Sequence, residues 1–217
     1  KEKMSKTLGT TVDPVALVDD YGADAVRYFL LREVPFDRDG EFTIEKFRAR
    51  YSADLSNDIG NLCQRTLSLV AKHLGGAIPL PAPVRAAADG ELITAFEGAA
   101  QPFRAEMEAF RFSQALERIW ALVGHCNRYI NESAPWKLRK DPAAAGRFEG
   151  VLYNLCEALR VLSILISPVM PFTAAAIRGQ LGLPVDLAPG ALEGAGRFGL
   201  IEPGARRIRS GRSGADD

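Results

Sequence analysis

The feature that most constrains this chain is a long run from Thr43 to His73, TIEKFRARYSADLSNDIGNLCQRTLSLVAKH, which holds no proline and one glycine. At 100° per residue, one stripe of the predicted helix is apolar: Ile44, Tyr51, Leu55, Ile59, Leu62, Leu69 and Val70. A second stripe, roughly 120° away, is polar: Asp54, Asn57, Asn61, Arg65, Ser68 and Lys72. The run therefore predicts a helix that packs on a core with one face and presents amides and cations on the other.

The rest of the chain is punctuated as further helices. Asp13-Pro14 and Asp141-Pro142 are helix starts, with Asp as the N-cap and Pro at the first helical position. The pattern predicts helices over residues 14–21 (ended by Gly22), 23–33, 87–110 (with a kink at Pro102), 113–131 (capped by Ser113), 142–165 and 171–181. No stretch predicts a strand. The expected fold is all-α: a helical bundle over residues 43–182, a small subdomain over residues 1–42, and a loose tail over residues 183–217.

Composition excludes several classes of protein. Lys plus Arg (27) equals Asp plus Glu (27), so any nucleic-acid binding would depend on local patches. No apolar run reaches the ~18–20 residues of a membrane span. Cys63, Cys126 and Cys156 are far apart and form no C-x-x-C, which favours buried thiols in a reducing cytoplasm. His73 and His125 have no partner at ligand spacing, so we expect no metal site.

Two lysines open the chain in Lys3-Met4-Ser5-Lys6-Thr7, on a polar loop. Ammonium groups at this spacing suit a triphosphate, because they offset charge that develops on a leaving pyrophosphate. The plain alternative is a solvated basic loop, which composition alone favours.

Two further pairs suit contacts with unpaired bases. Asn61 and Arg65 lie four residues apart on the polar stripe, and an amide with a guanidinium can read a base edge, although a solvated face is the simpler interpretation. Trp136 follows Pro135 in a predicted turn, where an indole can stack on a base or plug a core. Trp120, inside a periodic apolar helix, is a core candidate.

The sequence resembles methionyl-tRNA synthetases in four segments that occur in the right order. KMSKTLG is similar to the KMSKS signature of class I aminoacyl-tRNA synthetases, with Thr7 in place of the final Ser. DAVRYFLLREVPFDRDGEF resembles the segment after that signature. SADLSNDIGNLCQRTL and CNRYINESAPWKL resemble two helices of the family's anticodon-binding domain. The resemblance covers about residues 1–180.

The resemblance implies a role for each motif. Lys3–Thr7 would form a mobile loop that closes over ATP, with Lys6 stabilising the transition state. Residues up to about 42 would be the linker beneath the inner corner of the tRNA. Asn61 and Arg65 would contact the cytosine of a CAU anticodon, and Trp136, held by Pro135, would stack on an anticodon base.

The resemblance also implies a parent enzyme that joins methionine to its tRNA through an adenylate, using ATP and Mg²⁺. Because the chain begins Lys-Glu-Lys, we expect a fragment that is inactive alone, with any zinc in a missing N-terminal half. Two alternatives stay open. One is a class I synthetase for leucine, isoleucine, valine or cysteine. The other is a non-enzymatic helical module that binds RNA or another partner.

Overall fold

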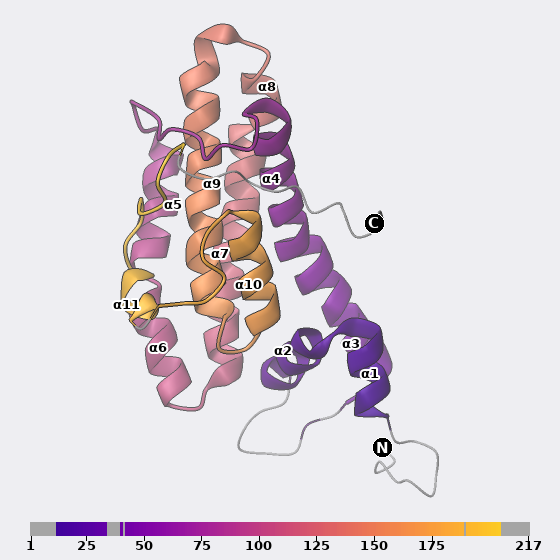
Figure 1. The fold of residues 1–217 in the computed structure, drawn as a ribbon. Coiled ribbons are helices and arrows are strands. Elements are labelled where there is room, and N and C mark those ends of the chain that lie inside the picture. The colour runs from indigo at the N-terminus through magenta and orange to yellow at the C-terminus, as the bar shows by residue number, and fades with distance from the viewer. Residues whose placement is uncertain (1–11, 34–39, 41, 189, 205–217) are drawn as a thin grey trace, which may run out of the picture.

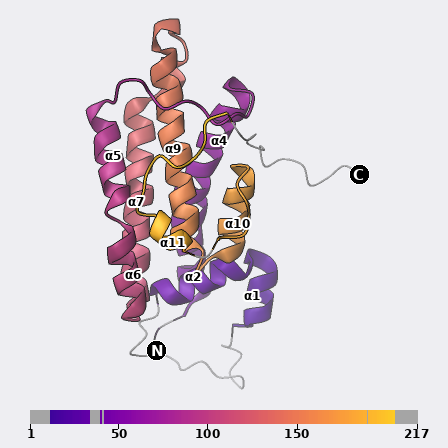
Figure 2. The same ribbon diagram turned by 60° about the vertical axis from the view of Figure 1, so that its left-hand side comes forward.

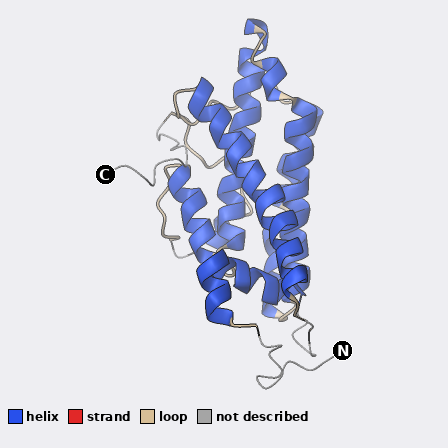
Figure 3. Cartoon of the chain, turned by 90° about the vertical axis from the view of Figure 1, so that its right-hand side faces the viewer, coloured by secondary structure: helices blue, strands red, loops and turns tan. Residues whose placement is uncertain are grey.

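The computed structural model describes residues 12–33, 40, 42–188 and 190–204, and every element in these ranges is helical (Figures 1 and 3). The elements are α1 (Pro14–Tyr21), α2 (Ala23–Glu33), α3 (Ile44–Arg50), the π-helix η2 (Tyr51–Gly60), α4 (Asn61–His73), α5 (Ala87–Glu97), α6 (Ala100–Glu108), α7 (Phe112–Ser133), α8 (Pro135–Leu138), the 3₁₀ turn η3 (Pro142–Ala144), α9 (Ala145–Ile166), α10 (Pro171–Gln180) and α11 (Ala191–Gly194). The all-α prediction is confirmed.

Helix α9 forms the axis of the bundle. Its residues from Gly150 to Ile166 are all buried, because α4, α5, α7, α8 and α10 each pack against it (Figures 1 and 2). The predicted start holds: Asp141 Oδ1 accepts a hydrogen bond from the amide of Ala143 (2.9 Å), and Pro142 follows as the first residue of η3. A helix of this length, about 33 Å, separates two ends of the molecule that have different roles.

A second, smaller apolar cluster joins α1, α2 and α3. Leu17, Ala25, Phe29 and Phe47 are buried in it, apart from the main core. The caps at Asp13 and at Gly22 (φ 83°) form as predicted. Because Phe47 belongs to this cluster, the first helix of the 43–73 run packs with the N-terminal helices as well as continuing into the bundle.

The 43–73 run is one continuous helical rod, as predicted, but its middle is wider than an α-helix. Residues 51–60 form the π-helix η2, which changes the angular step along the rod. The largest consequence concerns Asp54, which we placed on the solvated stripe but which is only 8% exposed. The other members of that stripe remain exposed or half-buried: Asn57, Asn61, Arg65, Ser68 and Lys72.

Two expected helix boundaries differ in the structure. The helix predicted over residues 87–110 is broken at Gly98–Ala99 into α5 and α6, so Pro102 lies in the first turn of α6, where it causes no kink. Ser113 does not cap α7, because α7 begins at Phe112. The Ser113 hydroxyl instead donates to the carbonyl oxygen of Arg32 (2.9 Å), and this bond ties α7 to α2.

Helix α2 is held against the turn between α9 and α10. Arg27 donates from Nε to the carbonyl of Val169 (2.7 Å) and from Nη2 to that of Pro168 (2.9 Å). Asp24 Oδ2 accepts from the amide of Thr173 in the first turn of α10 (2.6 Å). A cation therefore meets terminal carbonyls and a carboxylate meets terminal amides, which is the arrangement that helix dipoles favour.

The described part of the predicted loose tail is packed. The buried carboxylate of Glu157 accepts hydrogen bonds from the amides of Gly199, Leu200 and Ile201, at 2.8, 2.9 and 3.0 Å. Ile201 is 2% exposed. Where the sequence predicted a loose tail, residues 191–201 therefore pack on α9, while residues 184–186 and 202–204 are exposed. The glycine-rich composition gives no sign of this packing, because the segment has few apolar side chains. It is held instead by its backbone amides, which donate to one buried carboxylate.

Candidate nucleic-acid interface

Two segments that are distant in the sequence, α4 and the junction of α7 with α8, meet at a partly exposed position. The Arg65 guanidinium of α4 lies over the indole of Trp136 in α8, with Cζ 5.3 Å from the ring centroid. Arg65 Nη2 also donates to Oδ1 of Asn131, in the last turn of α7, at 2.7 Å. One guanidinium therefore joins a stacking contact with a hydrogen bond, and both contacts orient its plane.

The backbone around Trp136 is unusual. Ala134 ends α7 in the left-handed conformation (φ 42°, ψ 57°), which costs an alanine about 1–2 kcal/mol. Pro135 is buried as the first residue of α8, and the amide of Lys137 donates to the carbonyl of Ala134 (2.7 Å). The predicted turn at Trp136 is thus a one-turn helix. A strained residue beside an aromatic that is 38% exposed is a pattern that accompanies binding sites.

Asn61 lies one helical turn before Arg65 and is exposed. Its amide, the guanidinium of Arg65 and the indole of Trp136 therefore share one accessible region. Pro135, which precedes the indole in the chain, is buried at the start of α8. The other predicted site residues, Lys3–Thr7, lie outside the described residues.

Cations surround this region. Lys137, Arg139 and Lys140 are exposed on α8 and the turn after it. Burial, with the nearby charges of Arg139 and Lys72, lowers the pKa of His73 below its ordinary value. Arg139 and Lys72 therefore lie close enough to His73 to act on it, and these cations gather near α8 although the whole chain has no net charge.

The comparisons with known proteins agree with one another. Residues 1–67 match the family model described as "tRNA synthetases class I (M)", and residues 89–184 match "Anticodon-binding domain of tRNA ligase". A methionine–tRNA ligase of Caldanaerobacter subterraneus is 46% identical over 204 residues, which are 94% of this chain and 31% of that protein. One of Mycobacterium leprae is 43% identical over 203 residues, 88% of this chain and 38% of that protein.

A solved structure supports the same assignment. The Mycobacterium tuberculosis methionyl-tRNA synthetase in complex with methionyl-adenylate matches with a TM-score of 0.86 and 42% identity, over 94% of this chain and 40% of that chain. This chain belongs to the methionyl-tRNA synthetase family. The resemblance seen in the sequence is confirmed, and the chain spans about a third of the length of the curated relatives it matches.

One residue of this methionyl-tRNA synthetase region was missed as a site residue. Asn131 was treated only as the end of a helix, yet it holds Arg65. The signal available was its spacing: Asn127 and Asn131 are four residues apart and directly precede the Ala-Pro-Trp turn. Asn127 carries a buried amide oxygen with no partner in the described structure, so a second polar group lies in the same turns of α7.

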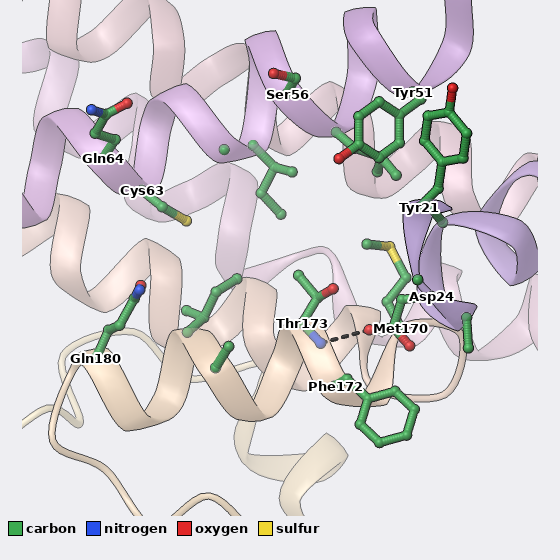
Figure 4. A pocket seen from close by; sticks show the side chains of 18 of the residues that line it. Tyr21, Asp24, Tyr51, Ser56, Cys63, Gln64, Met170, Phe172, Thr173 and Gln180 are labelled. Atoms are coloured by element: carbon green, nitrogen blue, oxygen red, sulfur yellow. Dashed lines mark hydrogen bonds between the residues drawn. The ribbon is translucent and has the colours of Figure 1, made fainter. Parts of the chain in front are cut away.

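The structure also contains a cavity of about 850 Å³ between the long helix and α10, bounded at one end by α1 and α2 (Figure 4). Its walls are mostly apolar. Cys63 faces it, and burial raises the pKa of its thiol to about 12, so the reactive thiolate is scarce at neutral pH. Within the described ranges no three His, Cys, Asp or Glu side chains are grouped to hold a metal ion.

None of the helices described in this methionyl-tRNA synthetase region combines the length and the apolar character that crossing a membrane requires.

Proposed function

We propose that this chain reads the CAU anticodon of methionine tRNA for a methionine–tRNA ligase. The observation that carries the proposal is the position of Arg65, which lies over Trp136 and is held by Asn131. Anticodon bases are unpaired, so they can stack on an aromatic side chain while side-chain amides and guanidinium groups read their edges.

Each residue suits one part of that task. Trp136 offers a face for stacking, and Pro135 holds it from below. Asn61 supplies a donor and an acceptor together, while Arg65 supplies only donors, which match the carbonyl oxygen and ring nitrogen of cytosine. Lys137, Arg139 and Lys140 would contact phosphates, which position the RNA without reading it.

The parent reaction is part of the same proposal. Methionine would be activated with ATP and Mg²⁺ and then transferred to the tRNA, in the cytoplasm. Lys3 and Lys6, within Lys3–Thr7, would stabilise the charge on the leaving pyrophosphate. Residues 1–42 would serve as the loop and linker and residues 43–182 as the anticodon-binding domain. The small cluster around Phe29 also takes in Phe47, so α3 packs with the N-terminal unit across that boundary.

The proposal predicts selective binding by the chain itself. A stem-loop with the anticodon CAU should bind at least about fivefold more tightly than one with UAU, because a wrong base costs roughly 1–3 kcal/mol. Fluorescence anisotropy at fixed salt measures both affinities. Equal affinities would favour a synthetase for another amino acid, and no binding to either RNA would favour a helical module that does not bind RNA.

A second prediction concerns Arg65. In Arg65→Lys the charge remains but the planar fork is lost, and with it both the contact over Trp136 and the fixed hydrogen bond to Asn131. We expect CAU affinity to fall about five- to tenfold, the equivalent of roughly 1–1.4 kcal/mol. Arg104→Lys, in an exposed ion pair with Glu108, is the matched control and should leave binding unchanged. Equal affinities of Arg65→Lys and the unaltered chain would exclude Arg65 from base reading.

A further inference from the structure

The long helix widens into η2 over the ten residues that directly precede Asn61. The backbone stays helical across both junctions: φ and ψ are −66° and −44° at Arg50, and −65° and −39° at Asn61. A π-helical turn joins residues i and i+5, and such turns are frequent at functional sites. Each one holds an additional residue relative to an α-helix, so it rotates everything downstream by about 100°. The direction in which Asn61 and Arg65 face therefore depends on η2.

Gly60 makes the last wide turn possible. A Cβ atom on Gly60 would lie 2.7 Å from the carbonyl oxygen of Leu55, five residues earlier. Real Cβ atoms do not approach other atoms so closely, and a backbone carbonyl cannot swing aside as the end of a side chain can. By contrast, a Cβ atom on Gly90 would meet nothing within 4 Å beyond the backbone of its own helical turn. The Leu55 carbonyl lies five residues before Gly60, which is the separation that a π-helical turn brings close.

A buried carboxylate holds the other part of η2. Asp54 Oδ2 accepts from the hydroxyl of Tyr28 in α2 (2.6 Å) and from Nη1 of Arg50 (3.3 Å). Arg50 also pairs with Glu33, at the end of α2. The carbonyl oxygen of Asp54 accepts from Nε1 of Trp120 in α7, at 3.4 Å. Asp54 thus connects the π-helix with two other helices.

Asp54, Tyr28 and Trp120 link the two helices that form the sides of the candidate interface. The rings of Tyr28 and Trp120 pack against each other at a tilt, with centroids 4.3 Å apart and planes at 34°. Trp120 and Asn131 belong to α7, whose end leads into Trp136. Asp54 and Arg65 belong to the long helix, in η2 and α4 respectively. A fixed contact between Asp54 and Trp120 therefore sets how α4 lies against the end of α7.

We propose that Asp54, Tyr28 and Gly60 are positioning residues for anticodon reading: they keep η2 in its wide register and thereby turn Asn61 and Arg65 toward Trp136. None of the three contacts the RNA. The inference rests on the proposed function, and it adds specificity residues that lie outside the recognition surface. Because Tyr28 belongs to α2, the N-terminal helices take part in setting the register through the main core.

Gly60→Ala is the main test, with Gly90→Ala as its control. The alanine at position 60 must displace the Leu55 carbonyl, so the wide turn changes. We expect CAU affinity to fall at least about fivefold, the loss of roughly one hydrogen bond, while UAU affinity changes less than twofold. Gly90→Ala should leave both affinities unchanged. A folded Gly60→Ala chain that keeps its full CAU preference would overturn the proposal.

Tyr28→Phe tests the same idea without steric change, and it replaces Gly60→Ala if that variant does not fold. It removes only the hydroxyl that donates to Asp54. The control is Tyr153→Phe, which removes a hydroxyl that donates to the carbonyl of Ile201, remote from η2. We expect CAU preference to fall in Tyr28→Phe alone. Equal loss of preference in both variants would show a general effect of stability and would refute a positioning role.

A measurement without RNA separates this inference from the proposed function. The chain has two tryptophans, so a ¹H–¹⁵N spectrum shows two indole signals. Gly60→Ala should shift the signal of Trp136, because Arg65 moves relative to its ring, and Gly90→Ala should not. If the unaltered chain binds no stem-loop, the proposed function fails while this shift still supports the positioning. An unmoved Trp136 signal would overturn the positioning whatever the RNA result.

Discussion

Trp136→Ala should lower the affinity for a CAU stem-loop by about 5- to 150-fold, since stacking one base on an aromatic side chain contributes roughly 1–3 kcal/mol. Trp136 is 38% exposed, so its removal should cost less stability than the removal of a fully buried aromatic side chain. Arg65 loses the ring beneath it but keeps its hydrogen bond to Asn131. We therefore expect a large loss of binding with little change in the free energy of unfolding. Anisotropy titration and urea denaturation measure the two quantities.

Phe172→Ala is the matched control for this variant. Phe172 is 71% exposed and begins α10, at the end of α9 opposite to α8 (Figure 1). Removing it should leave RNA affinity unchanged. If Trp136→Ala instead lowered stability and left binding intact, the indole would be a structural plug, which is the alternative that the sequence left open.

The boundaries that were predicted well depend on local chemistry. Asp13-Pro14 and Asp141-Pro142 each begin a helix with a capping carboxylate and a residue that cannot donate, and both caps are present. Gly22 ends α1 at a positive φ that glycine adopts without strain. Such signals need only neighbouring residues, so the sequence contains them in full.

The features that were missed depend on contacts across the fold. Asp54 looked solvated because a constant 100° step was assumed, whereas its burial follows from η2 and from the hydroxyl of Tyr28. The left-handed Ala134 has no sequence signal, since alanine ordinarily avoids that region. It is stabilised by its place between α7 and α8. Prediction from periodicity fails at these points because tertiary contacts override local preference.

Only part of the candidate interface was predicted, because the rest of it depends on contacts across the fold. The spacing of Asn61 and Arg65 on one helix is local, and it is correct in α4. The approach of Arg65 to Trp136 joins segments about seventy residues apart and required the family resemblance. Asn131 was missed because its role exists only once α4 and α7 lie side by side.

The largest effect on stability is expected at Asp89, whose carboxylate is fully buried. It accepts from Nη1 of Arg147 (2.8 and 2.6 Å), from the hydroxyl of Tyr129 (2.5 Å) and from the amide of Ala86 (2.8 Å). The hydroxyl of Tyr129 accepts in turn from Asn154 (3.0 Å). One carboxylate therefore joins α5, α7 and α9 and also caps the start of α5.

Asp89→Ala should lower the free energy of unfolding by about 2–4 kcal/mol, because it leaves the buried Tyr129 hydroxyl and the partly buried Arg147 guanidinium without their acceptor. Burial alone would raise the pKa of Asp89, but the hydrogen bonds from Arg147, Tyr129 and the Ala86 amide hold it below its ordinary value. A carboxyl whose pKa is lower in the folded state stabilises the fold above its unfolded pKa, about 3.9, and loses that contribution as the pH falls through the folded pKa. The difference in free energy of unfolding between the variant and the unaltered chain should thus be complete at pH 7 and shrink below about pH 4.

Urea denaturation at pH 7 and at about pH 3 measures this difference. Glu108→Ala, in an exposed ion pair, is the control that should show none. A difference that stays constant down to pH 3 would mean that the loss comes from packing, and that the charge of Asp89 contributes nothing.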